Sequence, residues 1–195
     1  MKYNSVALFC GSSSGDNTLY AEQAALFGTK VAQQRLTLYY GGGSIGLMGS
    51  AADAAMAHGG TVIGIAPNFF SKGNVLSDRI SDLIIVKTMS ERKQMMEEKA
   101  DAFVIFPGGY GTMDELFEVL TDAQLGLHDK PVLVYNFNHF FDPLLAQLDH
   151  FCKEGFLRPF HKGLLLSATT IEGIFDALNG YENTNDRNWL SKIKQ

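Results

Sequence analysis

Residues 107–115 could bind an anion and hold an acidic side chain close to it. They read Pro-Gly-Gly-Tyr-Gly-Thr-Met-Asp-Glu and directly follow the apolar run 102–106, which predicts a strand, a glycine-rich turn and a helix. Glycines let backbone N–H groups converge on a ligand, because they tolerate positive φ and have no Cβ. The start of the helix adds further N–H groups and the positive end of its dipole. We therefore predict a phosphate site formed by Gly108, Gly109, Tyr110, Gly111 and Thr112.

Glu115 lies within one helical turn of this predicted phosphate site. A carboxylate repels a bound phosphate, so a functional Glu115 should act on another part of the ligand. Thr112 and Glu115 also fit a capping box, in which the glutamate only closes the start of the helix. The spacing alone leaves both interpretations open.

A basic pair, Arg92 and Lys93, follows the fourth predicted strand, and we expect Arg92 at an exposed helix start. The pair could be a solvated helix face with Glu97, or it could face a ligand. The strands of a parallel sheet all end at the same edge, where ligands bind. Arg92 and Glu115 should therefore meet there, although they are far apart in sequence.

The elements that position these residues are predicted from seven short apolar runs. Most of the runs are continuous rather than alternating, which favours strands that are buried on both faces. Helical patterns lie between most of them, and only residues 67–80 show no clear periodicity. The sequence predicts a doubly wound α/β fold, with a mostly parallel sheet of about seven strands and helices on both faces. The strands are expected at residues 6–10, 36–40, 61–66, 83–86, 102–106, 132–135 and 164–166. The helices are expected at about residues 21–32, 46–58, 89–100, 112–125, 142–155 and 170–178.

Two more loops at the predicted ligand edge are rich in glycine and serine. Residues 11–15 read Gly-Ser-Ser-Ser-Gly after the first strand, and residues 41–46 read Gly-Gly-Gly-Ser-Ile-Gly after the second. Neither is the dinucleotide fingerprint or a phosphate loop with Gly-Lys-Ser/Thr, and such loops also use glycine for turn geometry alone. The spacing of the histidines does not fit a zinc site.

Composition places this chain among ordinary globular proteins. It has 195 residues, 46% hydrophobic residues and a net charge of −5, which argues against nucleic acid or an anionic membrane as the main partner. The start of the chain lacks a signal-peptide layout, and no apolar stretch reaches the ~20 residues of a membrane helix. With only two cysteines, we expect a cytoplasmic protein. We expect one nucleotide-binding domain over residues 1–182 and a polar tail at 183–195.

Several of these motifs together resemble the Lonely Guy (LOG) family of cytokinin riboside 5′-monophosphate phosphoribohydrolases. The resemblance rests on the run Met89-Ser90-Glu91-Arg92-Lys93, the motif at 107–115, residues 120–126, and the glycine-rich loops at 11–13 and 41–49. It extends from about residue 5 to residue 178. The combination of Pro-Gly-Gly-x-Gly-Thr-x-x-Glu with an upstream Arg-Lys pair is highly specific for this superfamily.

The resemblance implies hydrolysis of the N-glycosidic bond of a nucleoside 5′-monophosphate, with an N6-modified adenine or plain AMP as substrate. It implies a homodimer, no metal or organic cofactor, and Arg92 and Glu115 as the catalytic pair. Glu115 could stabilise an oxocarbenium-like state, hold the ribose or activate water. Substrate contacts are expected from Gly11, Ser12, Gly42, Gly43, Met89, Lys93, Gly108, Gly109, Tyr110, Gly111, Thr112 and Thr121.

This chain departs from the family pattern at two places. The family often has an acidic nucleotide contact about a helix length before the Arg-Lys pair, where this chain reads Lys72-Gly73-Asn74-Val75. Its usual Met-His-Glu-Arg is here Met89-Ser90-Glu91-Arg92. These departures put base and ribose recognition in question.

Two other functions compete with hydrolysis. Molybdenum-cofactor carrier proteins resemble this fold and its glycine-rich loops, but bind a nucleotide-like ligand without chemistry; Arg92 and Glu115 favour the enzyme. A pyridoxal-phosphate-dependent lysine decarboxylase is the third possibility. The short chain argues against it, as does the lack of an evident pyridinium partner for Lys93 or Lys99.

Overall fold

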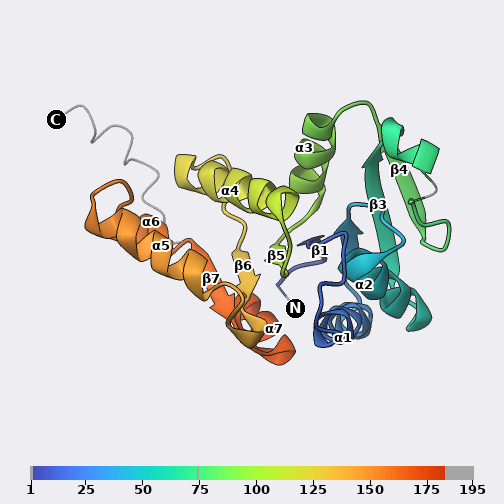
Figure 1. The fold of residues 1–195 in the computed structure, drawn as a ribbon, viewed down its shortest axis with the longest axis horizontal. Helices are drawn as coiled ribbons and strands as arrows, with labels where there is room; N and C mark the ends of the chain where they lie inside the picture. The colour runs from blue at the N-terminus through green and yellow to red at the C-terminus, as the bar shows by residue number, and fades with distance from the viewer. Residues whose placement is uncertain (1, 74, 183–195) are drawn as a thin grey trace.

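A single parallel sheet forms the centre of the molecule in the computed structural model, which describes residues 2–73 and 75–182 (Figure 1). Its seven strands lie in the order β4-β3-β2-β1-β5-β6-β7, and all neighbouring strands run parallel. The predicted α/β fold and all seven predicted strands are confirmed. The strands are β1 (Ser5–Phe9), β2 (Thr37–Tyr40), β3 (Thr61–Pro67), β4 (Asp82–Val86), β5 (Phe103–Ile105), β6 (Val132–Tyr135) and β7 (Leu165–Ala168).

Helices cover both faces of this sheet (Figure 1). Buried side chains of α1, α2 and α7 share one core cluster with the sheet, and those of α3 and α4 share the other, against which partly buried side chains of α5 pack. The strands β1, β5 and β6 are buried on both faces for this reason, which explains their continuous apolar sequences. The helices are α1 (Leu19–Gln33), α2 (Gly46–Ala57), α3 (Met89–Lys99), α4 (Tyr110–Leu125), α5 (Asp142–Lys153), α6 (Pro159–Lys162) and α7 (Ile171–Gly180).

A glycine brings α1 and α2 close together. Gly28 lies directly against the backbone of Ala51, and a Cβ at this position would overlap the Ala51 carbonyl. The alanines around Gly28 extend this flat face; Ala24 is fully buried. The close contact fixes α2, which follows the glycine-rich loop after β2, against α1.

The strand order changes direction between β1 and β5: the chain adds β2, β3 and β4 on one side of β1, and β5, β6 and β7 on the other. The loops after β1 and β5 therefore lead to opposite sides of the sheet. The two loops remain in contact, because Phe106 N donates to Phe9 O at 2.8 Å and Gly11 N donates to Pro107 O at 3.0 Å. Ligands of open α/β sheets bind at such a reversal, outside the carboxyl ends of the strands. The topology therefore places the ligand between the loops after β1 and β5.

The segment between β3 and β4 contains structure that the sequence did not predict. A 3-10 helix, η1 (Asn68–Gly73), follows β3 directly. Leu76 then forms an isolated antiparallel bridge with Gly43, and Ser44 N donates to Val75 O at 2.8 Å. Two further short elements, α6 and the 3-10 helix η2 (Phe137–His139), were not predicted either. Elements of about one turn are too short to show a periodic pattern.

The prediction of one domain over residues 1–182 stays a prediction. The expected tail at 183–195 lies outside the described residues. Within the described part of the chain, no helix is both long enough and apolar enough to cross a membrane.

A pair of carboxyl groups lies where α3 packs beside α4. The Glu97 side chain on α3 hydrogen-bonds to Asp122 on α4. Burial raises the pKa of Glu97 from 4.5 to about 7, and the neighbouring Asp122 carboxylate adds to this, while Lys130 opposes it. The fold therefore disfavours the ionised form of Glu97.

Glu97→Gln is expected to raise the melting temperature more at pH 8 than at pH 5. Because the pKa of Glu97 is higher in the fold than in the unfolded chain, this group destabilises the wild type progressively as pH rises from 4.5 to about 7. Glutamine resembles the neutral form and removes this effect. Thermal unfolding at both pH values measures it, with the exposed neighbour Glu98→Gln as control. Equal shifts at pH 5 and pH 8 would contradict the prediction.

Candidate active site

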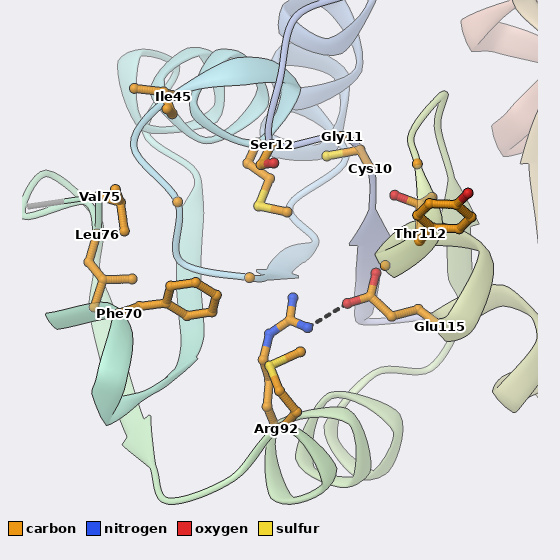
Figure 2. Close-up of a pocket in the computed structure, with 17 residues that line it drawn as sticks. Cys10, Gly11, Ser12, Ile45, Phe70, Val75, Leu76, Arg92, Thr112 and Glu115 are labelled. Carbon is orange, nitrogen blue, oxygen red and sulfur yellow. Dashed lines mark hydrogen bonds and ion pairs between the residues drawn. The ribbon is translucent and has the colours of Figure 1, made fainter. Parts of the chain in front are cut away.

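A pocket of about 490 Å³ opens at the carboxyl edge of the sheet, where the loops after β1, β2 and β5 meet the start of α3 (Figure 2). Its centre holds the side chains of Arg92 and Glu115, which point toward one another. Many of the predicted site residues line this pocket: Gly11, Ser12, Gly43, Met89, Arg92, Gly109, Tyr110, Gly111, Thr112 and Glu115.

Arg92 and Glu115 form a buried ion pair. Arg92 Nη1 lies 2.5 Å from Glu115 Oε1, and the two side chains are 6% and 5% exposed. Arg92 Nε also donates to Ile65 O at the end of β3, at 3.1 Å. The expectation of an exposed Arg92 was wrong, because the guanidinium turns inward to these two acceptors. The meeting of Arg92 and Glu115 at one edge is confirmed.

The start of α4 excludes the capping-box interpretation of Glu115. The helix begins at Tyr110 rather than Thr112, with Gly109 as its N-cap residue. Thr112 and Glu115 are therefore both inside the helix, and Glu115 cannot reach the N-cap backbone as a capping box requires. Gly109 has no side chain with which to accept N–H groups of the first turn. These groups can instead bind an anion that enters the pocket.

Burial dominates the electrostatics of Glu115. It raises the pKa of the Glu115 carboxyl, although the adjacent Arg92 guanidinium partly offsets the shift. Cys10, which directly follows β1 and lines the same pocket, is also buried. Burial and the Glu115 carboxylate raise the pKa of the Cys10 thiol, so Cys10 is a neutral group in the pocket wall. The Arg92 guanidinium, 2.5 Å away, favours the ionised form of Glu115 and so opposes the effect of burial.

Residues 48–178 match the family model described as possible lysine decarboxylase. The chain is 41% identical over 175 residues to the cytokinin riboside 5′-monophosphate phosphoribohydrolase of Rhodococcoides fascians, covering 89% of this chain and 88% of that protein. It is 38% identical over 185 residues to the cytokinin riboside 5′-monophosphate phosphoribohydrolase LOG5 of Arabidopsis thaliana, covering 95% of this chain and 81% of that protein. The chain belongs to the LOG family.

Solved structures share the fold of this LOG-family chain. The molybdenum cofactor binding protein from Rippkaea orientalis has a TM-score of 0.67 and 21% identity, covering 90% of this chain and 96% of that chain. The molybdenum cofactor carrier protein of Chlamydomonas reinhardtii has a TM-score of 0.67 and 20% identity, covering 89% of this chain and 94% of that chain. At this level of identity the likeness shows the fold alone.

Two residues in the LOG-family motifs do not line the pocket because their side chains turn elsewhere. Lys93 Nζ lies 2.9 Å from Glu118 Oε2 and 3.0 Å from Asp114 Oδ2, so it ties α3 to α4 outside the pocket. Thr121 Oγ1 donates to the Phe117 carbonyl at 2.6 Å and lines a separate depression next to α5. The structure does not bring either side chain to Arg92 and Glu115.

Two predicted glycines serve the geometry around the pocket. Gly108 lines a neighbouring hollow, and a Cβ there would overlap the Thr112 side chain. Gly42 has φ +76°, which favours glycine, and a Cβ there would lie 3.2–3.5 Å from the side chains of Leu83, Ala66 and Leu76. Both glycines therefore serve the shape of their loops, and the residues that follow them, Gly43 and Gly109, line the pocket.

Sequence reasoning missed one wall of the pocket. This wall consists of apolar residues from the start of α2 and the residue before it, from η1 and from the loop after η1, with the Phe70 ring pointing inward (Figure 2). The residues are Ile45, Met48, Phe70, Val75 and Leu76. Ile45 and Met48 stand in the motif at 41–49. No sequence pattern links them to the residues after β3, because the bridge between Gly43 and Leu76 joins two segments that are distant in sequence. Of the unusual stretch 72–75, Val75 belongs to this wall and Asn74 lies outside the described residues.

Among the described residues, no group of three or more His, Cys, Asp and Glu side chains could hold a metal ion.

Proposed function

We propose that this chain hydrolyses the N-glycosidic bond of adenosine 5′-monophosphate-type nucleotides, giving the free base and ribose 5-phosphate. The observation that carries the proposal is the Arg92–Glu115 pair, buried in a pocket beside the open start of α4. The relatives named as cytokinin riboside 5′-monophosphate phosphoribohydrolases support the same reaction.

The start of α4 would bind the 5′-phosphate, through the N–H groups of its first turn and the Thr112 hydroxyl. Glu115 comes later in the same helix, so it would face the ribose rather than the phosphate. In the reaction, a water oxygen bonds to C1′, the C1′–N bond breaks, and its electron pair leaves with the base, which takes up a proton. Positive charge develops on the sugar in this step, and a nearby carboxylate stabilises it.

Glu115 is suited either to this stabilising role or to taking the proton of the attacking water. Arg92 would orient the carboxylate and contact ribose or phosphate oxygens with its other N–H groups. A hydrolysis of this kind transfers no electrons between substrates, and the roles assigned here need neither a metal nor an organic cofactor.

The apolar wall favours a base that carries an apolar N6 substituent. Phe70 offers a ring face against which a purine can stack, while Ile45 and Val75 extend the apolar surface beyond it. Plain AMP would leave part of this surface in contact with water. Each buried methylene contributes about 0.8 kcal/mol, so an isopentenyl group gains affinity in such a pocket.

A panel of nucleoside monophosphates tests the proposed function. We expect release of base and ribose 5-phosphate in equal amounts, with N6-isopentenyl-AMP cleaved at least about tenfold better than AMP in kcat/KM, because several methylene-sized groups are buried. Separate detection of base and of ribose 5-phosphate measures the reaction. Phe70→Ala is the matched variant, and it should reduce the preference for the isopentenyl substrate. Absence of both products with every nucleotide would contradict the proposal.

A carrier of a nucleotide-like ligand is the second candidate, favoured by the fold shared with the molybdenum cofactor binding protein. A carrier needs no charged pair directed at a reacting bond, whereas this pocket is built around one. Tight nucleotide binding without turnover in the same panel would favour the carrier.

Lysine decarboxylation fits the site poorly, despite the description of the matching family model. A Schiff-base lysine must lose its proton, which burial or a neighbouring cation promotes. The Glu118 and Asp114 carboxylates around Lys93 instead raise the pKa of its ammonium group. Lys93 is therefore held as a cation outside the pocket.

We also propose a cytoplasmic homodimer. Exposed apolar side chains on and just beyond α4 support an interface there: Phe117 is 39% exposed, Leu125 41% and Leu127 69%. The expected contact elements are α3 and α4. Light scattering at micromolar concentration should give twice the monomer mass or a multiple of it, and Phe117→Glu should shift the mass toward the monomer. A monomeric wild type would contradict this prediction.

A further inference from the structure

Gly41, directly after β2, lies against the guanidinium group of Arg92. A Cβ at this position would come closer than 3.0 Å to Arg92 Nη2, a separation that real Cβ atoms essentially never show. It would also lie 3.4 Å from Arg92 Cζ and 3.2 Å from Met48 Sδ. The guanidinium thus occupies the space that any other residue at 41 would fill with its side chain.

Arg92 is confined by three segments: α4, β3 and the loop after β2. Glu115 on α4 accepts from Nη1 at 2.5 Å, and Ile65 at the end of β3 accepts from Nε at 3.1 Å. The backbone of Gly41 bounds the Nη2 end. Two of the five N–H donors of the guanidinium make these bonds, and the Nη2 end remains beside the pocket that Gly41 and Arg92 both line.

We propose that Gly41 is a positioning residue for Arg92: the missing side chain lets the guanidinium lie level with Glu115 and present Nη2 to the substrate. This inference rests on the proposed hydrolysis only for its effect on the rate. Its effect on the position of Arg92 holds for any ligand of the pocket.

The contact predicts a large effect from a single methyl group. In Gly41→Ala the guanidinium must move, because its Nη2 cannot overlap the new Cβ. A shift of about 1 Å in a catalytic constellation lowers rates by about a hundredfold. The backbone φ of Gly41 lies outside the left-handed region, so alanine acts through its contacts with Arg92 and with the end of the Met48 side chain rather than through backbone strain.

A double-mutant cycle with Arg92→Lys tests the proposal. The lysine Nζ would lie near the present position of Cζ, and lysine has no atom in the place of Nη2. We expect Gly41→Ala to lower kcat/KM for AMP about a hundredfold in the wild-type background and by less than about threefold in the Arg92→Lys background. The melting temperatures of the same four proteins should show the same coupling. Gly180→Ala, whose Cβ would meet nothing within 4 Å, is the remote control.

Each outcome bears on the proposal. Equal losses of kcat/KM in both backgrounds, or no loss in either, would overturn it. Gly41→Ala alone could fail to fold. In that case, a folded Gly41→Ala/Arg92→Lys double variant would show that residue 41 acts through Arg92, and a double variant that also fails to fold would overturn the proposal. If the wild type cleaves no nucleotide, the proposed function fails. The melting temperatures would then still test the positioning of Arg92 by Gly41. A smaller effect of Gly41→Ala in the Arg92→Lys background would support it, and an equal effect in both backgrounds would overturn it.

Discussion

Glu115→Gln lowers kcat by about a hundredfold or more if the proposed mechanism is correct. Glutamine keeps the size and the acceptor oxygen of Glu115, but it cannot carry the negative charge that stabilises an oxocarbenium-like state or take a proton from water. Removal of one preorganised electrostatic or acid–base group typically lowers rates by about 10²–10⁴-fold. Steady-state turnover of AMP measures the effect. Turnover close to that of the wild type would leave Glu115 with only the structural role of a counter-ion.

The same variant is also expected to lose stability, because Glu115 is the buried partner of Arg92 rather than a cap. Breaking a hydrogen bond to a charged group costs about 1.5–3 kcal/mol, and about 1 kcal/mol lowers the melting temperature by about 2–4 °C in a domain of this size. A decrease of several degrees is therefore expected. Glu118→Gln, one turn further along α4 and more exposed, is the control that should keep both turnover and melting temperature.

The strands and the positions of the loops that carry Arg92 and Glu115 could be predicted because both depend on local sequence. Continuous apolar runs such as 102–106 mark strands that are buried on both faces, and parallel strands bring their following loops to one edge. The meeting of Arg92 with Glu115 follows from this topology. Helix geometry explains why Thr121 does not line the pocket with Glu115. It lies six residues beyond Glu115 on a helix with about 3.6 residues per turn, and so on a different face.

The depth of Arg92 and the apolar wall could not be predicted, because both arise from contacts between distant segments. Burial of Arg92 requires the Ile65 carbonyl and the bare backbone of Gly41. The wall around Phe70 requires the pairing of Gly43 with Leu76. The start of α4 was misplaced for a different reason: Thr112 and Glu115 have capping-box spacing, but Gly109 already ends the loop and begins the helix.

Removal of the 5′-phosphate from the substrate is expected to lower kcat/KM by about a thousandfold. Each charge-assisted hydrogen bond contributes about 1.5–3 kcal/mol, and two such bonds at the start of α4 account for a loss of this size. This binding energy, remote from the reacting bond, also orients the ribose toward Glu115. AMP and adenosine are compared under the same conditions with the wild-type protein. Equal kcat/KM values for the two would contradict a phosphate site at this helix.

Substitution of Gly109 tests the same phosphate site by changing the protein instead of the substrate. It is the N-cap residue of α4, and a Cβ there would meet nothing within 4 Å. In Gly109→Asp, the new carboxylate can accept the first-turn N–H groups itself, as N-cap aspartates do, and it repels an incoming phosphate. We expect this variant to be at least as stable as the wild type, to lose most of its activity on AMP, and to keep its low activity on adenosine. Gly109→Ala adds the same Cβ without the charge, so it should retain the preference for AMP; a loss of that preference in Gly109→Ala would show that shape rather than charge sets it.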